Sequence, residues 1–237
     1  GAVAFLVASI VASVLLSLGV TLVETLPGTT SLGTQYVLVT IASAVGFGLF
    51  ALAYFGFMNR DPRAAVDVGW PSLRDLAVVL AGVVVLVVAN TAANWAISAF
   101  DLPFAQSQIQ AQAVEQGSAT FVLYLIPLSW LAVGPAEELV YRNIVQKDLY
   151  DALGRWGAVV VASAIFALIH ASQYASDAPG ATLVSLSLVF VLALVLAVAY
   201  ERTDNLVVPI LVHGTFNAYS FVLMYFAVTE QVAPALA

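Results

Sequence analysis

Cysteine is absent from this 237-residue sequence, and charged residues make up only 9% of it. Without cysteine the chain can form no disulfide, no thiolate nucleophile and no Cys-ligated metal site. Seven basic residues against fourteen acidic ones give a net charge of −7, which argues against nucleic-acid binding because that function needs a basic surface. Soluble domains are about 25% charged and about 45–50% apolar. With 62% hydrophobic residues, this chain is not a soluble globular protein.

Long hydrophobic runs are what the sequence does contain. A membrane-spanning helix needs about 20 mainly apolar residues, and seven segments of the chain meet this requirement. We therefore predict an all-α, polytopic transmembrane helical bundle that forms a single membrane domain over residues 1–237 and has the lipid bilayer of the cell membrane as its solvent. The predicted spans are 2–23, 36–58, 76–99, 119–146, 156–174, 182–200 and 205–228.

The basic residues predict the orientation of this bundle. In the seven-span arrangement, every Lys and Arg except Arg142 falls in connectors on the same side of the membrane. Cytoplasmic connectors carry an excess of Lys and Arg, so the N-terminus is predicted to be cytoplasmic and the C-terminus outside. The residues that carry this prediction are Arg60, Arg63, Arg74, Lys147, Arg155 and Arg202.

The longest predicted outer connector, residues 101–118, contains five glutamines among small and apolar residues. It is compatible with a short helix lying in the membrane interface. The first four glutamines, however, recur at every second position, which is not a helical period. A polar loop is an equally good interpretation.

Ionisable groups inside a bilayer are costly and usually mark function. Here they gather on the fourth, fifth and seventh spans, which hold Glu137, Glu138 and Arg142, then His170, then His213. Either histidine alone is best explained as a hydrogen-bonded packing residue, but the whole set favours a functional cluster. We expect these groups to meet in a cavity near mid-membrane that opens toward the cytoplasm.

Helical spacing gives the two glutamates different environments. Glu138 and Arg142 are four residues apart, so they share a helix face and can neutralise each other. Glu137 points about 100° away and is free to act as a base. Alternatively, both are simply acids at a helix entrance. The preceding Gly134-Pro135 pair predicts a break that splays the helix and admits water or an extended peptide.

Polar pairs with the same spacing occur on two other spans. His213 and Asn217 present two hydrogen-bond donors on one face, which suits stabilisation of an oxyanion. The alternative for this pair is hydrogen bonding between helices. Asn90 and Asn94 repeat the spacing without a titratable partner, and for them we expect a packing role.

The ordered set Glu-Glu-x-x-x-Arg, Phe-x-x-x-His and His-x-x-x-Asn resembles the CPBP family of intramembrane proteases, which includes the type II CAAX-prenyl endopeptidases and bacteriocin-immunity relatives. The resemblance implies a catalytic core over residues 119–228, whereas residues 1–118 match only in being hydrophobic. It also implies peptide-bond hydrolysis in a membrane-bound peptide or lipidated protein; one branch of the family removes a C-terminal tripeptide after a prenylated cysteine. The matching positions are Glu137, Glu138, Arg142, Phe166, His170, His213 and Asn217.

Under this hypothesis Glu137 activates a water, His170 orients that water or shuttles its proton, and His213 with Asn217 stabilises the oxyanion. A zinc mechanism stays open, with His170, His213 and Glu137 as ligands. We favour a metal-free mechanism because Arg142 disfavours a nearby dication. A proton-coupled transporter and a non-catalytic membrane scaffold are the alternative functions.

Overall fold

The computed structural model describes residues 31–232, and all regular structure in this range is helical. Six helices are long and apolar enough to cross a membrane, and each coincides with a predicted span. The remaining predicted span, 2–23, lies outside the described residues. The six are α2 (Leu32–Phe57), α4 (Leu73–Ala99), a composite helix (Val122–Gln146), α8 (Tyr150–Ile169), α9 (Pro179–Thr203) and α10 (Val207–Val232).

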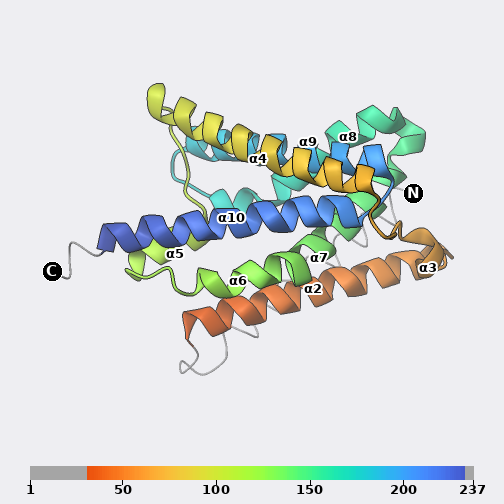
Figure 1. Cartoon of the computed structure of the whole chain (residues 1–237), viewed down its shortest axis with the longest axis horizontal. Coiled ribbons are helices and arrows are strands. Elements are labelled where there is room, and N and C mark those ends of the chain that lie inside the picture. Colours follow the sequence, from red (N-terminus) through yellow and green to blue (C-terminus); the bar gives the residue numbers. More distant parts are fainter. Residues whose placement is uncertain (1–30, 233–237) are drawn as a thin grey trace.

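Successive long helices run in opposite directions, so their connectors alternate between the two ends of the bundle (Figure 1). The two ends differ in their chemistry. The end formed by connectors 58–72, 147–149 and 204–206 is called the basic end, because six of the seven Lys and Arg residues lie in these connectors or in the adjoining helix turns. The opposite end, called the glutamine end, is formed by connectors 100–121 and 170–178. Helix α10 packs against α4, α6 and α9 and occupies the middle of the bundle.

The composite helix contains two π-helical stretches. It consists of α6 (Val122–Leu128), η1 (Ser129–Val133), α7 (Gly134–Glu138) and η2 (Leu139–Gln146). Gly134 keeps helical dihedral angles, and its N–H donates to the Ser129 carbonyl five residues earlier. The predicted break at Gly134-Pro135 is therefore wrong. A π-turn absorbs the proline because it shifts the register of the hydrogen bonds just before the pyrrolidine ring.

This composite helix and α10 cross closely at two glycines. A Cβ atom on Gly214 would lie 2.5 Å from Cδ1 of Trp130 and 3.0 Å from the Ser129 carbonyl oxygen. On the facing helix, a Cβ on Gly134 would lie 3.2 Å from the Ile210 carbonyl oxygen. Small residues let membrane helices approach at backbone distance. The crossing brings the helix of Glu137 and Glu138 against the helix of His213.

Residues 108–115 at the glutamine end are helical, which settles the alternatives left open by the sequence. Helix α5 (Gln108–Glu115) begins at Ser107, whose side chain accepts a hydrogen bond from the Gln110 N–H. The spacing of the glutamines at every second position was misleading, because the packed face of this helix contains Ala113, which is fully buried, and not the glutamines alone. A helical period was therefore present, but it was carried by small and apolar residues.

Neutral side-chain hydrogen bonds attach this connector to the bundle. The hydroxyl of Ser185 on α9 accepts from the N–H of Ala105 at 3.1 Å. The Gln108 amide donates to the Ser172 carbonyl at 3.0 Å, in the short helix η3 (Ala171–Tyr174). The Tyr36 hydroxyl on α2 donates to the Gln112 amide oxygen.

The basic end is held by ionic and amide contacts. Lys147 forms an ion pair with Asp67 at 2.8 Å, and Tyr200 donates to the same carboxylate. Asn143, which is 2% exposed, accepts from the Asp67 N–H and donates to the Ala65 carbonyl, both at 2.9 Å. The connector that contains α3 (Pro62–Ala65) is thereby fixed to η2.

Candidate active site

Glu138 lies at the centre of the cluster and is fully buried. Its Oε2 accepts from Nε of Arg142 at 2.9 Å, and its Oε1 accepts from Nδ1 of His213 at 2.8 Å. The predicted pairing of Glu138 with Arg142 is therefore present. A buried carboxylate is tolerable only when it is paired and hydrogen-bonded, and both of its oxygens have a partner here. The carboxylate thereby connects η2 to α10.

The guanidinium of Arg142 is fully buried as well. Its Nη1 and Nη2 have no hydrogen-bond partner among the described residues. The guanidinium carbon instead lies 5.2 Å from the centroid of the Phe166 ring on α8, within the range of a cation–π contact. Phe166 of the predicted Phe-x-x-x-His motif therefore contacts the cation that pairs with Glu138.

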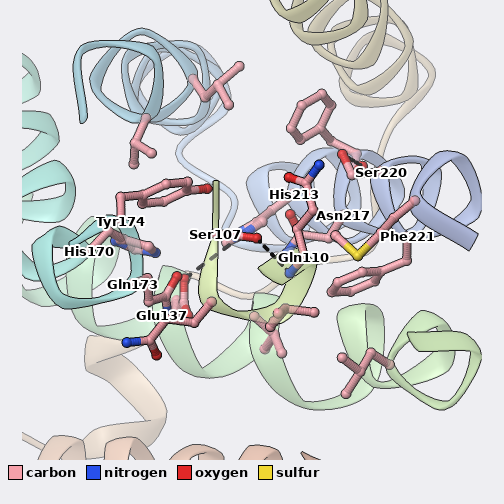
Figure 2. Close-up of a pocket in the computed structure, with 18 of the residues that line it drawn as sticks. Ser107, Gln110, Glu137, His170, Gln173, Tyr174, His213, Asn217, Ser220 and Phe221 are labelled. Carbon is pink, nitrogen blue, oxygen red and sulfur yellow. Dashed lines mark hydrogen bonds and ion pairs between the residues drawn. The ribbon is translucent and has the colours of Figure 1, made fainter. Parts of the chain in front are cut away.

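Glu137 faces away from this ion pair, as its helical position predicts. Its side chain is 18% exposed, and its Oε2 lies 3.9 Å from Nε2 of His213 (Figure 2). This distance is too long for a direct hydrogen bond, but an atom of water or substrate between the two groups could contact both. His213 thus has Nδ1 on Glu138 and Nε2 toward Glu137.

His170 lies at the end of α8, immediately after Ile169, rather than inside a span. Its Nδ1 is 2.7 Å from the Phe166 carbonyl oxygen, and because a carbonyl only accepts, Nδ1 carries the hydrogen. In the neutral ring Nε2 is then a free acceptor. The ring also packs on Phe166, with centroids 4.5 Å apart, while the His213 ring lies 6.1 Å from Phe166.

A turn at Gly154 marks where the regular part of the helix that ends at His170 begins. Gly154 has φ +65° and ψ 169°, so the helix proper starts after it. This left-handed conformation favours glycine. From Arg155 onward the helix is uninterrupted, and it ends at His170, which lines the cavity.

A cavity of about 880 Å³ is lined by four of the six predicted site residues, namely Glu137, His170, His213 and Asn217. Glu138 and Arg142 do not line it and lie behind it. The cavity reaches the glutamine end, where its wall includes Gln108, Gln110 and Gln112, and no described residue of the basic-end connectors lines it. The expected opening toward the basic connectors, which we assigned to the cytoplasm, is therefore wrong.

Several cavity residues were missed by sequence reasoning. Asn90 and Asn94, which we expected to be packing residues, line the cavity. Gln173 and Tyr174 of η3 also line it, and Figure 2 shows both on the same side as His170. Burial raises the pKa of Tyr174 above its ordinary value, so its hydroxyl keeps its proton. For Asn90 and Asn94 the available signal was the polar i, i+4 pair itself.

The candidate metal ligands are not gathered into one cluster in the described part of the chain. Among residues 31–232 no group of three His, Cys, Asp or Glu side chains is close enough to hold a metal ion. The candidate zinc ligands His170, His213 and Glu137 share the cavity but are not assembled as a ligand set.

Part of the chain matches a known protein family. Residues 119–219 match the family described as type II CAAX prenyl endopeptidase Rce1-like. A comparison with curated proteins and one with solved structures each found no match. The matched range contains all six predicted site residues and the close crossing of the composite helix with α10. Residues 119–219 therefore form a domain that matches the Rce1-like type II CAAX prenyl endopeptidase family.

Proposed function

We propose that this protein is an intramembrane endopeptidase that hydrolyses a peptide bond of a membrane-associated substrate with a glutamate-activated water. The single observation that carries the proposal is the unequal placement of the two glutamates. Glu138 is sealed in an ion pair, whereas Glu137 faces the cavity 3.9 Å from Nε2 of His213. The family match supports the same class of activity, a CAAX-type intramembrane protease.

In the proposed reaction Glu137 takes a proton from a water whose oxygen adds to the scissile carbonyl carbon. The Glu138 carboxylate stabilises a doubly protonated His213, so that Nε2 can donate to the developing oxyanion, with the Asn217 amide as second donor. The C–N bond then breaks, and the leaving amine takes a proton from Glu137 or through Nε2 of His170. The ion pair of Glu138 with Arg142 positions His213.

The proposed mechanism uses no metal ion. A carboxylate can act as a general base when a desolvated site adjusts its proton affinity. Activity that is lost on chelation and returns with stoichiometric zinc would refute this part of the proposal.

The substitution Glu137→Gln tests the central role. General-base catalysis contributes about 10²–10⁴-fold, so hydrolysis should fall by about that factor while the thermal unfolding temperature stays unchanged. The matched control is Glu115→Gln, because Glu115 is an exposed glutamate of α5 that does not line the cavity. Near-normal turnover by Glu137→Gln would refute the assignment. Solute flux into liposomes without peptide cleavage would favour the transporter instead.

We further propose that the basic end faces the cytoplasm and the glutamine end faces outside. The support is the distribution of Lys and Arg described above. Because the sequence has no cysteine, single cysteines at Ser72 and Asp177 can be labelled without background. They should react from opposite sides of the membrane, and labelling of both from one side would contradict the orientation.

A further inference from the structure

No Lys or Arg side chain lines the cavity in the part of the chain that the structure describes. That part includes all seven Lys and Arg residues of the sequence. Six of the seven lie at the basic end, away from the cavity. The seventh, Arg142, is sealed behind Phe166 and paired with Glu138. His213 can carry a positive charge, but it faces Glu138 at Nδ1 and Glu137 at Nε2. An incoming anion therefore finds no unmatched positive charge.

The cavity is long relative to a short peptide. On α10 its lining runs from His213 to Ala227, which is about 21 Å at a helical rise of 1.5 Å per residue. An extended peptide advances about 3.3 Å per residue, so about six residues fit between the site and the far end of this wall. A chain that ends three residues from the cut bond would leave its terminus about halfway along the cavity.

The wall of the cavity suits a neutral peptide. Near the glutamine end, Gln108, Gln110 and Gln112 offer amide donors and acceptors, and Asn217 adds another amide close to His213. Such groups match the N–H and C=O groups of an extended backbone. A carboxylate would instead lose its hydration without gaining a counter-charge, and the negative charge of Glu137 would repel it.

We propose that the cavity selects an uncharged, extended peptide segment and that the bond cut is internal, about six or more residues from the substrate's C-terminus. A free terminal carboxylate inside the cavity is selected against. This inference rests on the proposed function for the identity of the cut bond, but the selection against a carboxylate is a binding property of the cavity. Selection against a terminal carboxylate therefore distinguishes an internal cut from removal of a C-terminal tripeptide.

Binding to the full-length Glu137→Gln chain in lipid nanodiscs tests the proposal without depending on hydrolysis. The probe is a short peptide of Ala, Val, Leu, Ser and Gln with a neutral N-terminal fluorophore, prepared with a C-terminal amide or a free acid. The amide should bind at least about tenfold more tightly, because only the acid buries an unpaired charge. Because Glu137→Gln also removes the carboxylate that faces Nε2 of His213, the double variant Glu137→Gln/His213→Gln, which lacks both charges, is measured beside it and should show the same preference. Extending both forms by about ten Ser and Gln residues should abolish the preference, because the terminus then reaches water.

A placed cation should reverse the selection. In the same background Gln110→Arg should bring the affinity for the short acid close to that for the amide. Gln116→Arg is the matched control, because Gln116 is exposed on the same connector and does not line the cavity. Equal affinity for the two short forms without any added arginine, or binding of neither, would overturn the inference. Selective binding of the amide, together with no hydrolysis by the unmodified chain, would refute the proposed function but not this inference.

Discussion

The two ends of the bundle differ in how they are held together. At the basic end, the ion pair of Lys147 with Asp67 joins two connectors, and that of Arg155 with Glu201 joins α8 to α9. At the glutamine end, no ion pair joins the described connector residues, and neutral hydrogen bonds such as that of Ser185 to Ala105 take their place. The cavity reaches only the second of these ends. The comparison indicates that the basic end contributes rigidity and the glutamine end contributes access.

The candidate site lies where these two regions meet. Glu138 and Arg142 belong to the sealed part of the bundle, and Glu137, His170 and Asn217 belong to the cavity. Neighbouring glutamates therefore have opposite surroundings. Substitutions of the same chemical kind should consequently have different effects on the two sides of this boundary.

Glu138→Gln should have the largest effect on stability. The substitution leaves Arg142 fully buried without its counter-charge, and a single amide oxygen then remains to accept from both Arg142 and His213. Breaking a buried pair costs about 3–5 kcal/mol, so the unfolding temperature and the activity should both fall. Glu137→Gln is the control, with activity lost and stability retained. Equal stability of the two variants in thermal unfolding in detergent would contradict the boundary between sealed and open regions.

Asn143→Ala should destabilise the basic end without changing the site. Loss of the amide leaves the Asp67 N–H without its partner and removes one of the two donors to the Ala65 carbonyl, which Lys147 still contacts at 3.3 Å, at a cost of about 1–3 kcal/mol. Peptide hydrolysis below the unfolding temperature should be unchanged. Arg60→Gln at the same end is the control. Its ion pair with Asp148 is partly exposed, and such pairs contribute about 0–1 kcal/mol. A fall in the turnover number with Asn143→Ala would show that the basic end also supports catalysis.

The sequence predicted the sealed part of the site better than the open part. The Glu138 pair follows from the i, i+4 spacing alone, and the six described spans follow from hydropathy. The predicted helix break at Pro135 was wrong, because a π-turn depends on the register of the backbone hydrogen bonds, which composition does not encode. The cavity wall was missed because Asn90, Gln110 and Gln173 come from segments far apart in the chain, and only tertiary packing brings them together.

Ser185→Ala should have the smallest effect, and it tests access at the glutamine end. The Ser185 hydroxyl is buried and accepts from the Ala105 N–H at 3.1 Å, so its loss should cost about 1 kcal/mol. Because Ala105 precedes α5 in the connector that lines the cavity, loosening it should raise KM severalfold and leave kcat nearly unchanged. Ser187→Ala is the matched control on the same helix, since the Ser187 hydroxyl is exposed and donates to the Leu183 carbonyl of its own helix. If instead kcat falls and KM is unchanged, the connector supports the reacting groups rather than the bound peptide, and the division between a rigid end and an access end does not hold.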